Sequence, residues 1–594
     1  MSSEQRPAPF RMPERLFAEL AAGGGSAAAV AFLERGERAR RLLLLRTLLD
    51  RLATLPTPLT PATEAWHVLK EAATRAHDPV ERLLLAPATG GWLAHVLRRA
   101  HGTASGPPLW ADAGHLCALA VTASLHAGTD AELRVPLVDG ALTLPGLGLA
   151  RLPDAEGGLT VGLARTSGGE LTLAGPGRHG VTTSVTIRPG TAGSGNGPGS
   201  ESGSEGAGYG SAAASWLPLR TLTHPAPTGT VAIPLDDLDP YRDLDDPLPP
   251  ARLDAAETKA WQRVFEGAVT VLAVPGGVGP GRLDPAWIRS VVPWGRTSTD
   301  PPAPPTVQVS ASSGDSFGAM VIARPSSALA LAETLVHEFQ HSKLAALLHL
   351  FPLLDDDREE RYYAPWRPDP RHLTGLLHGA YAFTGVAGFW RDRLAVARDG
   401  RTGGEDSEIA PPDDRAAVEE EAGYHFALRR LQSRLVVRTL LAEGRLTPQG
   451  RALVSGLART LDGWLREPVP ASALARARTA AALHRTEWRL RNVAPTDDAA
   501  YPAATRFRLD RASWPDLRTH AFATRPTVPH TADEHLAAGD PGAALARYAD
   551  ELAADPAEPH ALAGWIVARA TLDPGRTARR MLARPELLQP QPSG

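Results

Sequence analysis

The sequence HEFQH at 337–341 constrains the fold more than any other feature of the chain, because it has the form H-E-x-x-H. Residues four apart lie on one face of a helix, so His337 and His341 can bind one metal ion if this stretch is helical. The Pro-Ser-Ser sequence at 325–327 is typical of a helix start, and a strand is predicted before it. The pattern predicts a metal-binding helix that follows a strand, the order found in zincin folds. The alternative is two helical histidines that make ordinary hydrogen bonds.

A metal ion held by two histidines needs a third protein ligand. Three protein ligands fix the ion and leave some of its coordination positions open. The shorter metzincin continuation of the motif is absent, because leucines stand where it requires Gly and His. His349 is two turns beyond His341 and about 80° around the helix, too far to join. We therefore expect the third ligand on the next helix, predicted at 372–390. We choose His378, with His372 as the runner-up and a core histidine as the alternative.

The sequence RYYAPWRPDPR at 361–371 contains three arginines, three aromatic residues and three prolines. Prolines stiffen the segment, and guanidinium groups pair bidentately with carboxylates. We predict a carboxylate-binding wall beside the metal; the alternative is a rigid surface connection with solvated arginines. The candidate ligand-binding arginines are Arg361, Arg367 and Arg371, and the candidate substrate contacts are Tyr362, Trp366 and Tyr381.

Changes in residue pattern divide the 594 residues into five regions, since one core cannot serve so long a chain. The expected fold class is α+β. It has a helical N-terminal region, a β-rich middle, a zincin-like α/β metal-binding core and a helical C-terminal region with a tetratricopeptide-like hairpin. Two helices are expected within 531–572, and a single pair of this kind serves for packing rather than as a peptide-binding array. The regions are 1–130 (helical), 131–249 (β-rich, with a flexible Gly/Ser-rich loop at 191–215), 250–415 (metal-binding catalytic core), 416–530 (helical) and 531–594 (hairpin and tail).

Charge and cysteine content argue against several classes of protein. The formal net charge is -4, which gives no electrostatic reason to bind nucleic acid or an anionic membrane. Cys117 is the only cysteine, so neither an intramolecular disulfide nor a cysteine-ligated metal cluster is expected. No stretch approaches the roughly 18 apolar residues of a membrane span, and the first residues lack a signal-type apolar segment. We expect a cytoplasmic protein.

Several sequence blocks resemble the HExxH-motif peptide-modification proteins of bacterial ribosomal-peptide (RiPP) clusters. The most specific blocks are AETLVHEFQHSKL, YYAPWRPDPR and LLHGAYAF, and FAELAAGGG, LDPYRD and SSGDSFGAM add to them. Some members of the family are iron(II)- and 2-oxoglutarate-dependent hydroxylases, and in some relatives the domain is fused to a radical-SAM enzyme. The resemblance implies hydroxylation of a precursor peptide, with a radical-SAM enzyme of the same pathway as a candidate partner. It also implies that His337, His341 and His378 bind iron. By the same resemblance Arg367 and Arg371 bind 2-oxoglutarate, and Arg361 is the next choice for this role.

Two other functions remain open from the sequence. In a zinc metallopeptidase of the gluzincin type acting on a cytoplasmic peptide, Glu338 takes a proton from the zinc-bound water. In a hydroxylase, Glu338 is not a ligand and orients a ligand or the substrate from outside the coordination sphere. A non-catalytic protein that binds a peptide or a partner enzyme would use its surfaces alone. The spacing of the motif does not distinguish iron(II) from Zn²⁺.

Overall fold

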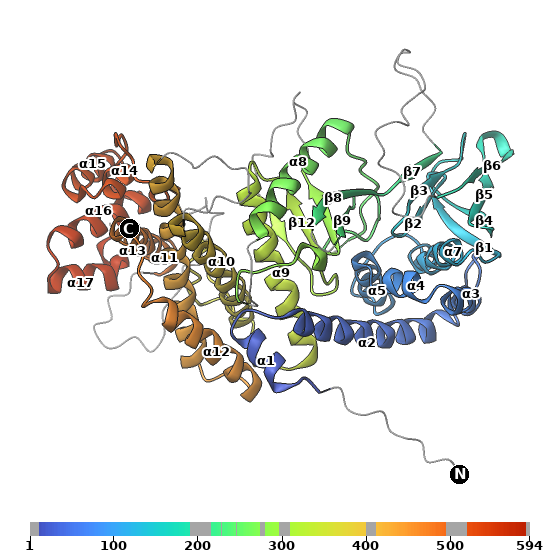
Figure 1. Cartoon of the computed structure of the whole chain (residues 1–594), viewed down its shortest axis with the longest axis horizontal. Coiled ribbons are helices and arrows are strands. Elements are labelled where there is room, and N and C mark those ends of the chain that lie inside the picture. The colour runs from blue at the N-terminus through green and yellow to red at the C-terminus, as the bar shows by residue number, and fades with distance from the viewer. Residues whose placement is uncertain are drawn as a thin grey trace, which may run out of the picture. The chain divides into compact units, whose positions relative to one another are not determined.

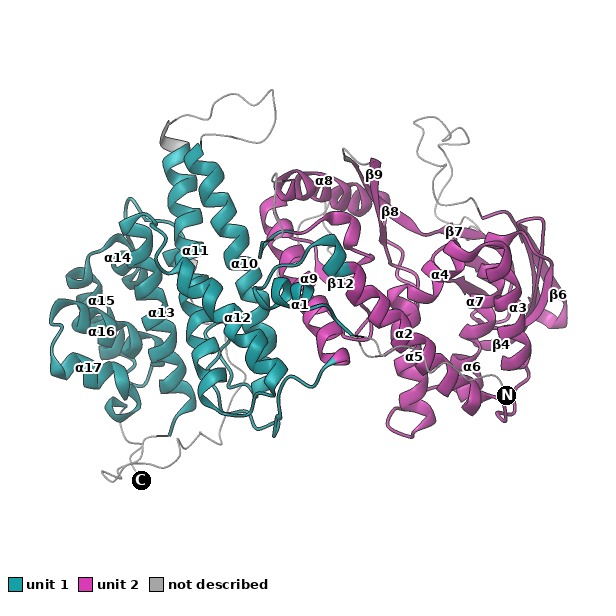
Figure 2. Ribbon diagram, turned by 60° about the horizontal axis from the view of Figure 1, so that its bottom comes forward, with its two compact units in different colours: residues 1–30, 274–282, 351–594 teal, residues 31–273, 283–350 magenta. Residues whose placement is uncertain are grey.

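The structure is a computed structural model that describes residues 11–189, 215–226, 229–244, 246–273, 279–295, 309–399, 412–494 and 520–589. The chain forms two compact units (Figure 2). The sheet unit contains residues 31–273 and 283–350, and the helical unit contains residues 1–30, 274–282 and 351–594. The Gly/Ser-rich loop predicted at 191–215 lies outside the described residues except for its last position.

The first part of the sheet unit is a layer of helices packed on an antiparallel sheet (Figure 1). The last of these helices, α7, is buried along most of its length because it carries small and apolar residues all round. Strand β1 alternates, so that residues at 133, 135 and 137 enter the core. The helices are α2 (Ala27–Leu52), α3 (Ala62–Arg75), α4 (His77–Leu85), α5 (Pro87–Ala100), α6 (Leu109–Ala113) and α7 (His115–Ala127).

The antiparallel sheet has seven strands in the order β6-β5-β4-β1-β2-β3-β7. Asp139 and Gly140 join β1 to β2 with φ angles of 50° and 69°, the combination that a two-residue hairpin turn with right-handed twist requires. The strands are β1 (Ala131–Val138), β2 (Ala141–Leu144), β3 (Gly148–Arg151), β4 (Leu159–Ser167), β5 (Glu170–Pro176), β6 (Thr182–Ile187) and β7 (Trp216–Pro218).

The second sheet of this unit is mixed and has the order β11-β12-β10-β9-β8. Strand β10 pairs in parallel with β9 and β12, whereas the edge strands β8 and β11 run antiparallel to their neighbours. Every residue of β12 is buried, as expected of a parallel strand covered on both faces. The strands are β8 (Arg220–Ala226), β9 (Gly229–Leu235), β10 (Ser290–Trp294), β11 (Ser310–Ala311) and β12 (Ala319–Ala323), and helices α8 (Ala255–Leu272) and α9 (Ala328–Leu350) pack together beside them.

The helical unit is built around the neighbouring helices α10 and α11 (Figure 2). Its C-terminal helices share one apolar core with α11 and α13, in which Tyr548 and Ile566 are fully buried. The N-terminal helix α1 packs on α12. The helices are α1 (Glu14–Ala21), α10 (Leu373–Asp399), α11 (Pro412–Ala442), α12 (Pro448–Trp464), α13 (Ala471–Asn492), α14 (Ala532–Ala538), α15 (Pro541–Ala554), α16 (Pro559–Leu572) and α17 (Arg576–Ala583).

The mixed helix and strand content predicted from the sequence is confirmed, with helices at both ends and sheets between them. The expectation of two helices within 531–572 is wrong, because the structure has three there and α14 precedes the expected pair. A capping box of Thr531 and Glu534 starts this helix, and Gly539, with φ 87°, ends it. No described helix is both long enough and apolar enough to cross a membrane.

Candidate metal centre

Helix α9 carries the H-E-x-x-H motif as predicted. Ser327 accepts a hydrogen bond from the amide of Ala330 at its start, which is the expected capping interaction. The Nε2 atoms of His337 and His341 lie 3.1 Å apart, and their rings are nearly perpendicular at 80°. Both side chains are half-buried. The four-residue spacing therefore brings two imidazole nitrogens to one point on the helix face.

This pair of nitrogens fits a single metal ion. With metal–nitrogen bonds of about 2.1 Å, a separation of 3.1 Å corresponds to an angle of about 95° at the metal. Both octahedral and distorted tetrahedral sites accept that angle. The donor set therefore suits iron(II) or Zn²⁺ and leaves further positions to be filled.

The opposite side of the motif is anchored in the sheet unit. Phe339 is buried, stacks on Trp287 at a ring distance of 5.9 Å and meets Phe317 edge-on at 6.2 Å. Ser342 accepts a hydrogen bond from the amide of Gly318 in the turn before β12. These contacts fix the rotation of α9 and with it the direction of the two histidines.

Glu338 is only 1% exposed, and its Oε2 has no hydrogen-bond partner among the residues the structure describes. Burial raises the pKa of its carboxyl, and the nearby Ser310 and Ser312 side chains act against that rise. An orphaned carboxylate oxygen in such a place is costly unless a further group satisfies it. The position next to the two histidines suits a carboxyl that handles a proton or a polar ligand.

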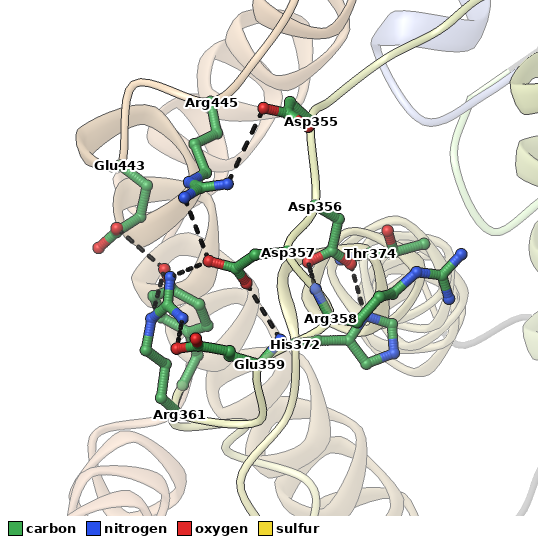
Figure 3. Close-up of polar contacts among 11 residues, drawn as sticks. Asp355, Asp356, Asp357, Arg358, Glu359, Arg361, His372, Thr374, Glu443 and Arg445 are labelled. Carbon is green, nitrogen blue, oxygen red and sulfur yellow. Dashed lines mark hydrogen bonds and ion pairs between the residues drawn. The ribbon is translucent and has the colours of Figure 1, made fainter. Parts of the chain in front are cut away.

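Of the candidate third ligands, His378 lies on α10 and His372 directly precedes it, both in the helical unit. Burial, with a smaller effect of the neighbouring His372, lowers the pKa of His378 to about 4, so this imidazole is neutral near pH 7, the form that binds a metal. His372 Nδ1 lies 2.6 Å from Asp356 Oδ2, a carboxylate that also accepts the Thr374 amide (Figure 3). The two motif histidines belong to the sheet unit, and His378 as their companion ligand stays a prediction.

The arginines of 361–371 are all engaged with carboxylates close to them in sequence. Arg367 and Arg371 share Asp369, at 2.9 and 3.3 Å. Arg361 pairs with Asp357 at 2.6 Å and with Glu359, as Figure 3 shows. Arg367 and Arg371 each use one nitrogen on Asp369, and both keep contact with solvent, so donors remain for a ligand carboxylate.

The aromatic candidates pack inside the helical unit. Tyr362 donates to Glu443, and the fully buried Tyr381 donates to the carbonyl of Leu20. The Trp366 ring packs against Phe383 at 4.8 Å between ring centres, with the planes tilted by 31°. All three side chains hold the unit together, and their contact with a substrate stays a prediction.

The acidic partners of this region were not predicted from the sequence. Asp356 orients His372. Burial acts to raise the pKa of the Asp356 carboxyl, but hydrogen bonds from Thr374 and His372 outweigh burial and hold this pKa well below its usual range. Asp369 pairs with two arginines. The signals were present as the run DDDREER at 355–361 and the aspartate inside RPDPR.

A second group of possible metal ligands lies at the start of α4. His77, Asp78 and Glu81 bring their ligand atoms within 4.8 Å of one another. His77 and Asp78 are exposed, and Glu81 is already paired with Arg38 at 2.6 Å. This is an ordinary arrangement of surface charges.

Comparison with known proteins adds no family to these observations. No family model matches the sequence, and no curated protein matches it.

Proposed function

We propose that the protein is a metal-dependent peptide-modifying enzyme, an iron(II)- and 2-oxoglutarate-dependent hydroxylase of a ribosomally made precursor peptide. The observation that carries the proposal is the 3.1 Å approach of the His337 and His341 Nε2 atoms on a capped helix. Iron(II) held on one face by protein ligands supplies oxidation chemistry with oxygen and 2-oxoglutarate. The resemblance of the 312–390 blocks to peptide hydroxylases favours this chemistry over others.

The chain's own residues have defined tasks in this proposal. His337 and His341 bind the metal, and His378 completes the set. Arg367 and Arg371 bind the distal carboxylate of 2-oxoglutarate, which their solvent contact permits. Glu338 stays out of the ligand set, and its burial supports a role in orienting its neighbours.

A zinc metallohydrolase is the second candidate, and Glu338 is the observation that favours it. Its raised pKa and its orphaned oxygen are properties of a general base that takes a proton from a metal-bound water. A non-catalytic peptide-binding role is the third candidate, and the converging nitrogens weigh against it.

Two features of the fold support the finer parts of the proposal. The mixed sheet with an antiparallel edge strand, next to the motif helix, supports a zincin-like core. The pairing of α15 with α16, where the Tyr548 ring lies against Gly564, supports a tetratricopeptide-like hairpin. A cytoplasmic location and a radical-SAM partner belong to the same proposal.

The test is anaerobic reconstitution with iron(II), followed by addition of 2-oxoglutarate, oxygen and a peptide encoded beside the gene. We expect the peptide to gain the mass of one oxygen atom while succinate is released in equal amount. Cleavage of the peptide with zinc, without oxygen or 2-oxoglutarate, would establish the hydrolase instead. Binding of the peptide without any change in its mass would establish the non-catalytic role.

A further inference from the structure

The first helices of the sheet unit enclose a pocket that the proposed chemistry does not use. Residues of α2, α3, α4 and α5 wall this pocket, and its volume is about 130 Å³ (Figure 1). An apolar cavity of about 150 Å³ holds a molecule the size of benzene. The pocket therefore has room for one compact group, such as the side chain of leucine or phenylalanine.

The floor of the pocket is apolar, and its side chains are at most 3% exposed. These side chains are Leu45, Val80, Trp92 and Leu93. The mouth is apolar as well, because Leu42 lines it and is 41% exposed. An exposed apolar surface that continues into a buried apolar floor is typical of an interaction site.

The buried polar side chains of the wall already have hydrogen-bond partners within the protein. Thr89 donates to the carbonyl of Leu83, and Trp92 Nε1 donates to the carbonyl of Asp112, both at 2.8 Å. The terminal nitrogens of Arg41 donate to backbone carbonyls. A charged or strongly polar group that entered the pocket would lose its water and gain little in return, so the pocket selects a neutral, apolar group.

The rim of the pocket is charged and keeps contact with solvent. The Arg38 Nε atom lies 2.6 Å from Glu81, and the exposed His77 ring lies 3.8 Å from the other oxygen of Glu81. An apolar floor with a polar, solvated rim is the usual anatomy of a peptide or protein interface. There one bulky side chain is buried at the centre while the rim contacts the main chain around it.

We propose that this pocket anchors a peptide segment by one bulky apolar side chain, of the size of leucine or phenylalanine. The side chain is buried between α2, α4 and α5, and carbonyl groups of the adjoining peptide accept hydrogen bonds from the solvent-exposed nitrogens of Arg38 and His77. A peptide is favoured over a free apolar molecule, because only a peptide offers polar groups to the charged rim. This inference does not rest on the proposed hydroxylase function.

Two pairs of neighbouring residues provide matched variants. Ala73 lines the pocket from α3, so Ala73→Leu fills it, whereas Thr74→Leu adds the same side chain at the exposed next position. Leu42→Glu places a charge at the mouth, whereas Leu43→Glu places it on an exposed neighbour that does not line the pocket. All four positions are at least partly exposed, so the fold tolerates these changes.

Binding of N-acetylleucinamide and N-acetylphenylalaninamide to the full chain is measured by ligand-observed NMR titration. We expect dissociation constants on the order of 1 mM for single capped residues. Ala73→Leu and Leu42→Glu should each weaken binding about tenfold, whereas Thr74→Leu and Leu43→Glu should leave it unchanged. N-acetylglutaminamide, whose side chain is close to leucine in size but polar, should bind about tenfold more weakly than N-acetylleucinamide.

Toluene distinguishes the two sources of an apolar group. Tighter binding of N-acetylphenylalaninamide than of toluene supports the peptide, because the main chain then adds to the contacts of the ring. Equal or tighter binding of toluene assigns the pocket to a free apolar molecule and overturns the proposal. Absence of binding by both apolar capped residues at about 10 mM, or equal loss of binding in the two members of each variant pair, also overturns it.

Discussion

Glu338 separates the two candidate chemistries at the scale of a single residue. Glu338→Gln keeps the size of the side chain but cannot accept a proton. A zinc hydrolase should lose about 10²- to 10⁴-fold in rate, because general-base catalysis contributes that much. A hydroxylase should keep most of its turnover, because Glu338 does not accept a proton in that reaction. The measurement is kcat of this variant with peptide cleavage and peptide oxidation followed in parallel by mass spectrometry.

The metal ligands are tested residue by residue through metal content. His337→Ala and His341→Ala should each lower the bound metal to a small fraction of the wild-type level, because removing one ligand of a chelating pair weakens binding by orders of magnitude. His378→Ala should also weaken it. His67→Ala, on the exposed face of α3, is the control. Elemental analysis after dialysis gives the result, and undiminished metal in His378→Ala would move the assignment to His372.

At the scale of elements, Trp366 joins the 361–371 loop to α10 through Gly379. A Cβ at Gly379 would come within 2.0 Å of the Trp366 ring, so Gly379→Ala must displace the loop. We expect a loss of about 1–3 kcal/mol in the free energy of unfolding. Gly463→Ala on α12, where a Cβ meets no atom within 4 Å, should be neutral or stabilising. Chemical denaturation of the two variants makes the comparison; equal stability would mean that the loop is not held at this contact.

The C-terminal helices contain a charged network that should make their stability depend on pH. Burial opposes the charge on His560, but hydrogen bonds and attraction to Asp533 and Glu487 raise its pKa to about 10. The folded pKa lies above the unfolded value of about 6.5, so the stabilisation is complete below pH ~6.5 and is lost as the pH rises through 10. His560→Gln should cost about 3 kcal/mol near neutral pH and flatten this dependence.

The matched control for this network is His530→Gln, which changes an exposed histidine in the same region. Thermal unfolding of both variants is measured between pH 6 and pH 10 in steps of about one pH unit, which gives the dependence of stability on pH. A wild-type profile that coincides with that of His560→Gln would show that the histidine is not charged in the folded state.

At the scale of the whole molecule, local patterns predicted the elements but not their partners. The helix that carries His337 and His341 was predictable, because its start and the four-residue spacing depend on neighbours in sequence. The pairing of β7 with β3 was not predicted, because it depends on how the chain returns on itself. For the metal centre, the sequence predicted the two histidines on one helix face, whereas the carboxylate partners of His372, Arg367 and Arg371 were not predicted.

The docking of α1 on α12 has a consequence for how the protein is made. The Thr460 hydroxyl donates to the carbonyl of Ala22, and these residues are 438 positions apart. At a synthesis rate of about 5–20 residues per second, the first helix leaves the ribosome roughly 20–90 s before its partner exists. During that interval Leu16 and Leu20, which are buried in the finished protein, have no surface to cover them. The nascent chain therefore presents an apolar N-terminal segment to chaperones for much of its translation, and the helical unit closes only after most of the chain has been made.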